Sequence, residues 1–116
     1  MKKTIFLDID GCLIKHQGNL SKQILSEPEL LPGTIEKLNE WDAAGHKIIL
    51  TTGRKESMRK ITEEMLTSFG IFYDQIVMGC NRGERILIND LKSDISIHTA
   101  SAIEIKRNEG IQNISL

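Results

Sequence analysis

The order of short apolar runs along the chain constrains its fold more than any other feature. These runs are short enough for strands, and segments with helical spacing separate the first three of them. Alternation of strand and helix is the usual way in which parallel strands are connected. The sequence therefore predicts an α/β domain with a central, mainly parallel sheet in a three-layer, Rossmann-like arrangement. The predicted strands cover residues 4–9, 46–53, 73–79 and 85–90.

Two helices are predicted between these strands. The first begins near Pro32-Gly33-Thr34 and ends at Gly45, a position typical of a C-terminal cap. The second falls within residues 54–70, where apolar side chains form one stripe. Residues 11–32 are expected to be irregular, and the tail could add short strands at 101–106 and 111–116. With 116 residues and no linker or repeat, the chain 1–116 is interpreted as a single domain.

Composition excludes several functions. The chain is 40% hydrophobic and 27% charged with a net charge of −1, so it has no basic footprint for nucleic acid. No stretch approaches the roughly 20 apolar residues of a membrane span, and the first apolar run meets Asp8 too early for a signal peptide. Cys12 and Cys80 form neither a disulfide framework nor a metal-binding spacing. A cytoplasmic protein is expected.

Polar residues follow three of the predicted strands at the point where each strand ends. In an open parallel sheet the ligand crevice lies outside the carboxyl ends of the strands, so these residues are expected to meet there. Clustered carboxylates suit a hard cation such as Mg²⁺, which takes one or two protein carboxylates and substrate phosphate. The "TTGRK" segment adds a hydroxyl and backbone N–H groups at a helix start, where phosphate is favoured. The residues concerned are Asp8 and Asp10, Thr51 and Thr52, and Asn89 and Asp90.

Ordinary explanations compete with these functional ones. Thr51 and Thr52 also suit a strand through their β-propensity, and Asn89-Asp90 could be a turn. Arg54, Arg82 and Lys92 are each interpreted as surface charges rather than site residues.

Four segments resemble motifs of the haloacid dehalogenase superfamily, which consists largely of phosphatases. "FLDIDGCL" is similar to its D-x-D-G motif, and "IILTTGR" to its second motif, a Thr or Ser closing strand two. "MGCNRGER" stands in the place of the third motif, and "ILINDLKSD" is similar to the fourth. The order is that of the family, and the resemblance covers essentially the whole chain.

The resemblance implies a role for each matching residue. Asp8 would be the nucleophile that forms an aspartyl-phosphate, and Asp10 the general acid and base. The Asp8 side chain, the Asp10 carbonyl and Asp90 would hold Mg²⁺. Phosphate contacts would come from Gly11, Thr52, Gly53 and Arg85.

The chain also departs from the family pattern. No lysine occupies the third motif, so Arg82, Arg85 or Lys92 has to supply its cation, and Arg85 is preferred. Asp94 could be a second acid of the fourth motif. The connections after the first and third strands are too short for the family's cap domain, which predicts a capless protein. Capless relatives act on large substrates or close the site by oligomerising, so a homo-oligomer is an open alternative.

The predicted function is Mg²⁺-dependent hydrolysis of a phosphomonoester. A small sugar phosphate is the favoured substrate, because the short chain and its motifs resemble capless proteins of bacterial surface-sugar synthesis. A nucleotide phosphatase of the same fold is one alternative. A phospho-accepting receiver or a catalytically weak binding module is another, although the third strand ends "IVMG" without the acid that a receiver needs.

Overall fold

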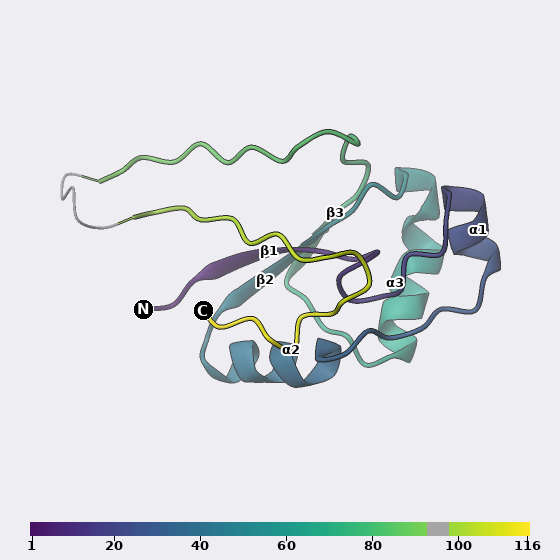
Figure 1. The fold of residues 1–116 in the computed structure, drawn as a ribbon, viewed down its shortest axis with the longest axis horizontal. Helices are drawn as coiled ribbons and strands as arrows, with labels where there is room; N and C mark the ends of the chain where they lie inside the picture. Colours follow the sequence, from purple (N-terminus) through teal and green to yellow (C-terminus); the bar gives the residue numbers. More distant parts are fainter. Residues whose placement is uncertain (93–97) are drawn as a thin grey trace.

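A computed structural model describes residues 1–92 and 98–116 of the chain (Figure 1). The first two predicted strands, the two predicted helices and part of the third strand are confirmed, with bounds that shift by a few residues. The regular elements are β1 (Thr4–Asp8), α1 (Leu20–Leu25), α2 (Thr34–Ala43), β2 (Lys47–Thr51), a 3₁₀ turn η1 (Glu56–Met58), α3 (Arg59–Ser68) and β3 (Gln75–Val77).

The three strands form one parallel sheet in the order β1-β2-β3. The register pairs Asp8 with Thr51, and Thr51 with Val77. The last residues of all three strands therefore stand side by side at the carboxyl edge. The predicted α/β, Rossmann-like fold with a parallel sheet is confirmed.

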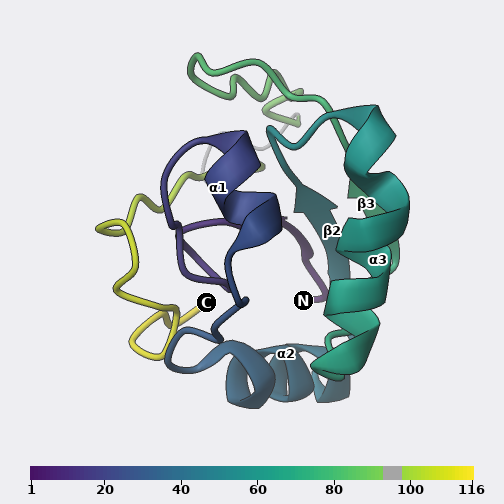
Figure 2. The ribbon, with the colours of Figure 1, turned by 90° about the vertical axis from the view of Figure 1, so that its right-hand side faces the viewer.

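The carboxyl edge faces α1 and α3. Figure 1 shows both helices beyond the ends of the strands, and the turned view in Figure 2 places α1 in front of them. Helix α2 lies along another side, where it contacts β2. A site at the ends of the strands thus lies on the side of the sheet where α1 and α3 stand.

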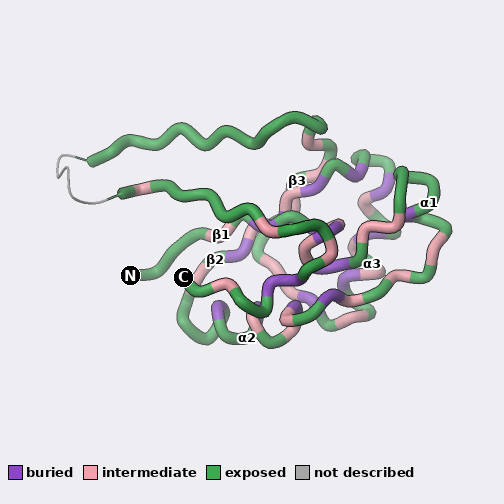
Figure 3. The backbone as a smooth tube through the Cα atoms, viewed as in Figure 1, coloured by how far each residue is buried: buried purple, intermediate pink, exposed green. Residues whose placement is uncertain are grey.

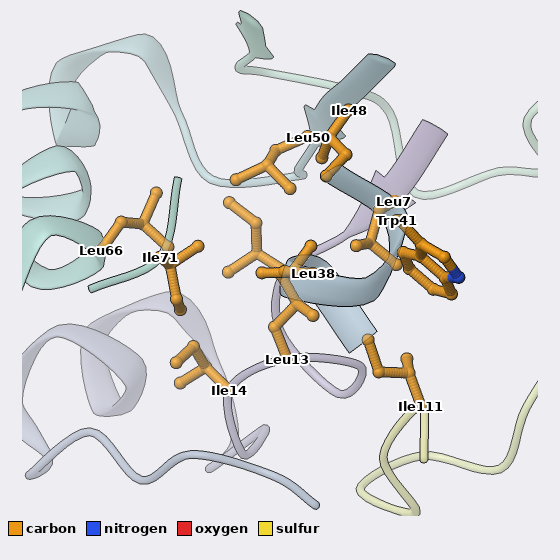
Figure 4. Close-up of a cluster of buried hydrophobic side chains, with 11 residues drawn as sticks. Leu7, Leu13, Ile14, Leu38, Trp41, Ile48, Leu50, Leu66, Ile71 and Ile111 are labelled. Carbon is orange, nitrogen blue, oxygen red and sulfur yellow. The ribbon is translucent and has the colours of Figure 1, made fainter. Parts of the chain in front are cut away.

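One apolar cluster holds the strands, α2, α3 and the tail together (Figure 4). Leu50 of β2, Leu38 of α2 and Leu66 of α3 are each fully buried in it. Trp41 of α2 is only 3% exposed, and Ile111 of the C-terminal tail is fully buried in the same cluster. The tail is therefore part of the core, although it forms none of the strands predicted there.

Local chemistry explains how α2 begins and ends. The buried hydroxyl of Thr34 donates to the carbonyls of Leu13 and Leu31, which ties the first turn to the loop after β1. At the other end Gly45 has a φ of 86°, the left-handed conformation that glycine adopts readily after a helix. The predicted helix start and glycine cap are both confirmed.

The expectation of an irregular segment at 11–32 is wrong in part, because α1 lies within it. Asn19 caps this helix, and its side-chain oxygen accepts a hydrogen bond from the N–H of Lys22. The helix has only six residues, too few for a clear apolar stripe, which explains why periodicity missed it. It is the one helix between β1 and α2, so the connection from β1 to β2 holds two helices.

The predicted fourth strand at 85–90 is wrong, and so is the short strand at 101–106. Both segments belong to an extended arm, defined here as residues 81–92 and 98–106, which projects from the body in Figure 1. Residues 81–92 are all exposed, as the tube in Figure 3 shows, and Ile88 is 89% exposed. An apolar run becomes a strand only where a neighbour supplies hydrogen bonds, and no described strand pairs with these segments. None of the described helices is long and apolar enough to cross a membrane.

Candidate active site

The last residue of β1 and the tight loop that follows it carry the two aspartates of the first motif. The carbonyl of Ile9 accepts hydrogen bonds from the N–H groups of Cys12, Leu13 and Ile14, at 2.9–3.2 Å. Gly11 sits inside this loop with a φ of 91°. Its N–H donates to the Ile14 carbonyl at 2.7 Å, so this N–H already has a partner and is not free for phosphate.

Asp8 is the last residue of β1 and is exposed as a whole residue. The protein around its carboxyl group still removes enough water to raise its pKa above the ordinary value, and the charge of Asp10 adds to this effect. The guanidinium of Arg85 and the N–H of Ile9 act in the opposite direction, because both favour the ionised form. Arg85 is an exposed residue of the arm, and its positive charge favours the ionised form of Asp8; its role as the third-motif cation stays a prediction.

Asp10 is held by a buried arginine. The Nε and Nη2 atoms of Arg54 donate to Oδ2 and Oδ1 of Asp10, each at 2.8 Å. The Arg54 side chain is only 4% exposed, so the interpretation of Arg54 as a surface charge is wrong. The physical reason is that the Asp10 carboxylate accepts two hydrogen bonds from the guanidinium. These two bonds offset the hydration that the guanidinium loses on burial.

Thr52 and Gly53 lie beside this pair, directly after β2. Thr52 is 1% exposed, and its hydroxyl oxygen accepts a hydrogen bond from the N–H of Arg54 at 3.0 Å. The Thr52 carbonyl accepts from the N–H of Cys80, which anchors the segment after β3 against the same turn. Gly53 is exposed at the tip of this turn, next to the Cys80 carbonyl. Thr52 thus stands at the predicted edge, with a hydroxyl proton available for donation.

The fourth-motif residues lie elsewhere. Asp90 is an exposed residue of the arm, where its carboxylate accepts from the N–H of Lys92 and its carbonyl accepts from the hydroxyl of Thr99. Because residues 85–90 do not pair with β1, Asp90 is not brought beside Asp8 and Asp10. Arg82 and Lys92 are also exposed, and Asp94 lies outside the described residues.

The predicted magnesium ligands are consequently not assembled as one group. Among residues 1–92 and 98–116, no three His, Cys, Asp or Glu side chains are placed to hold a metal ion. Asp8 offers a carboxylate at the site, the Asp10 carboxylate is paired with Arg54, and Asp90, which was expected to complete the set with the Asp10 carbonyl, lies on the arm. The described donors therefore do not fit the complete ligand set that the family implies.

Gln23 is a site residue that the sequence did not reveal. It lies on α1, is 7% exposed, and donates through Nε2 to Oδ1 of Asp10 at 3.0 Å. A lone glutamine in a six-residue helix carries no motif, so no pattern could have identified it. Arg54 did carry a signal, because it follows Thr52-Gly53 directly.

A groove with a volume of about 320 Å³ opens between α1 and α3. Gln23 and Arg54 form part of its wall, together with the apolar side chains of Ile24, Ile61 and Met65. Glu64 places a negative charge at the same groove. Through Gln23 and Arg54, which both donate to the Asp10 carboxylate, the groove adjoins the site.

These features define the class of protein: a small α/β protein with a parallel sheet and two aspartates at the carboxyl edge of that sheet. The family follows from comparison. The chain matches the family model of haloacid dehalogenase-like hydrolases over residues 5–108, and it belongs to that family. The resemblance of its motifs to that superfamily is thereby confirmed.

Comparison with solved structures supports the same fold. A structural-genomics target from Vibrio cholerae is similar, with a TM-score of 0.53 and 24% sequence identity. The match covers 89% of this chain and 91% of that chain. No curated protein matches the chain significantly.

Proposed function

We propose that this hydrolase is a phosphomonoesterase that works through an aspartyl-phosphate on Asp8. The observation that carries the proposal is the pair Asp8 and Asp10 at the carboxyl edge of the sheet. Asp10 is fixed by Arg54, and the positive charge of Arg85 favours the ionised form of Asp8. Such an arrangement combines a nucleophile, an acid–base group and a cation for phosphate.

The reaction has two steps. In the first, a carboxylate oxygen of Asp8 attacks phosphorus and the bond to the leaving oxygen breaks. That oxygen takes the electron pair and receives a proton from Asp10. In the second, Asp10 removes a proton from water, the water oxygen attacks phosphorus, and the bond to Asp8 breaks. Orthophosphate leaves, and both aspartates return to their initial states.

Thr52 and Arg85 are assigned to the transferred phosphoryl group. The buried Thr52 hydroxyl can donate to one phosphoryl oxygen, and the guanidinium of Arg85 can neutralise the others. Gly53, exposed at the tip of its turn, allows phosphate to approach the backbone closely.

Mg²⁺ is proposed as the cofactor because the chain belongs to a family that generally uses it. When bound, the ion would supply positive charge to the phosphoryl oxygens. Asp8 and the Asp10 carbonyl are the groups at the edge of the sheet that would contribute ligands. Asp90, the third ligand that the family resemblance implies, lies on the exposed arm.

A small sugar phosphate is the proposed substrate, and a nucleotide is the alternative. The groove between α1 and α3 combines apolar and polar walls and has room for a small leaving group. We further propose a cytoplasmic protein that binds neither nucleic acid nor membrane, in keeping with the net charge of −1 and two free cysteines. A homo-oligomer that closes the open crevice is part of the same proposal.

Phosphate release with and without Mg²⁺ tests this function. Sugar phosphates, nucleotides and phosphoamino acids would serve as a panel, with p-nitrophenyl phosphate as the generic substrate. The Asp8→Asn variant should lose at least about a thousandfold in kcat, because a neutral amide does not attack phosphorus. EDTA should abolish turnover in the wild-type chain.

Asp42→Asn is the matched control, because Asp42 is an exposed aspartate near the end of α2. It should leave turnover unchanged. Full activity in Asp8→Asn would overturn the mechanism. Preference for nucleoside monophosphates over every sugar phosphate would overturn the proposed sugar substrate. The aspartyl-phosphate mechanism would be retained.

A further inference from the structure

Every nitrogen atom of the Arg54 guanidinium has a hydrogen-bond acceptor. Two of them donate to Asp10, and Nη1 donates to the hydroxyl of Thr62 on α3 at 3.0 Å. Thr62 is fully buried and Arg54 nearly so. Arg54 is therefore fixed between α3 and the loop after β1, and the edge formed by its Nε and Nη2 atoms is turned toward Asp10.

Gln23 holds the same carboxylate from the side of α1. Its Nε2 donates to Oδ1 of Asp10 and to the carbonyl of Lys15, and its Oε1 accepts from the N–H of Gln17 at 2.6 Å. Oδ1 of Asp10 thus accepts two side-chain hydrogen bonds, whereas Oδ2 accepts one. Since a carboxylate oxygen has two lone pairs, Oδ2 remains able to exchange a proton.

We propose that Arg54 is a positioning residue, which orients Asp10 so that Oδ2 carries the proton to the leaving oxygen and from the attacking water. The inference rests on the proposed function, because it assigns Asp10 to proton transfer. It separates the two arginines near the site: Arg54 orients the acid–base group, and Arg85 remains the cation for phosphate.

The leaving group of the substrate provides the test. An alkyl alcohol needs a proton as it leaves, whereas p-nitrophenolate leaves without one. The parameter kcat/KM reports the first step, so it isolates this difference from the later attack of water. We expect Arg54→Gln to lower kcat/KM for an alkyl phosphate by about 100-fold, within the usual range of acid–base catalysis. For p-nitrophenyl phosphate the loss should stay below about threefold.

Two further variants refine the result. Arg54→Lys keeps the charge but loses the planar fork, so it should show the same selective loss. Thr62→Val removes one contact of Arg54 in a nearly isosteric way and should give a smaller selective loss of about two- to fivefold. The matched control is Arg59→Gln, because Arg59 makes an ion pair with Glu56 at the surface, and it should alter neither substrate.

Equal losses for both substrates would show that Arg54 only supports the fold, and unchanged kinetics would show that Asp10 needs no orientation. Either outcome overturns the inference while Asp8→Asn still tests the proposed function. If the wild-type chain hydrolyses neither substrate, the function and the inference fail together. The hydrogen bond between Arg54 and Asp10 can also be tested in variants that are too unstable for kinetics. NMR would measure how fast the Arg54 Nε–H exchanges with solvent. Exchange should become faster in Asp10→Asn, and an unchanged rate would contradict the contact.

Discussion

The side chain of Asn108 binds both backbone polar groups of His16, a residue 92 positions earlier in the chain. Its Oδ1 accepts from the His16 N–H at 2.7 Å, and its Nδ2 donates to the His16 carbonyl at 3.2 Å. The N–H of Asn108 also donates to the carbonyl of Gly11. The C-terminal turn therefore holds the loop that carries Asp10 at Gly11 and just beyond it at His16.

Replacing Asn108 by alanine should destabilise the chain by about 1–3 kcal/mol, since two partly buried hydrogen bonds are lost. Urea denaturation followed by circular dichroism measures the difference. Asn108→Asp is the matched control: it keeps the acceptor for the His16 N–H and loses the donor, so its effect should be smaller. An unchanged midpoint in Asn108→Ala would contradict this role of the turn.

Gly110 allows the tail to pass close to Pro32. A Cβ atom at Gly110 would lie 2.4 Å from the Pro32 carbonyl oxygen, and its φ is 90°. Gly110→Ala should therefore cost about 3 kcal/mol or more, because the tail has to move. Gly70→Ala isolates the backbone contribution, since Gly70 has a φ of 74° with open space around it, and it should cost about 1–2 kcal/mol. Equal effects in thermal unfolding would argue against the close contact.

Cys12 should react slowly with alkylating reagents. Burial, together with the charges of Asp8 and Asp10, raises the pKa of its thiol to about 11 from an ordinary 9.0. At pH 8 the reactive thiolate is then about a hundredfold scarcer than for an ordinary thiol, and its fraction increases as the pH rises toward 11. Mass spectrometry of iodoacetamide adducts measures the rate. Asp8→Asn should accelerate the reaction, and rapid alkylation in the folded wild-type chain would contradict the shift.

Two isoleucines test the exposure of the arm. Ile88 is 89% exposed and Ile111 is fully buried. Ile88→Ser should change the free energy of unfolding by less than about 0.5 kcal/mol, whereas Ile111→Ser should cost about 3–5 kcal/mol. A large loss in Ile88→Ser would instead indicate that residues 85–90 pack as the strand their sequence predicts.

The sequence predicted those parts of the fold that depend on local patterns. The apolar runs of β1 and β2 and the glycine at position 45 marked their elements, because burial and backbone conformation leave local traces. The prediction of a strand at 85–90 was wrong, because a strand also needs a partner for its hydrogen bonds. Pairing between distant segments cannot be inferred from a local apolar run.

The site was predictable to a similar extent. Asp8, Asp10 and Thr52 stand at one edge because parallel strands bring their ends together. The pair of Arg54 and Asp10 joins residues 44 positions apart, and Gln23 reaches the same carboxylate from α1. Such contacts depend on how the helices pack against the sheet, and composition and spacing do not encode that packing.

The core position of Trp41 provides a spectroscopic signal for the state of the tail. Trp41 is the only tryptophan of the chain, and it shares its apolar cluster with Ile111 (Figure 4). Detachment of the tail would admit water to the indole and shift its fluorescence to longer wavelengths. Because the same tail holds the loop of Asp10 through Asn108, the emission of one native residue reports whether the candidate active site is assembled.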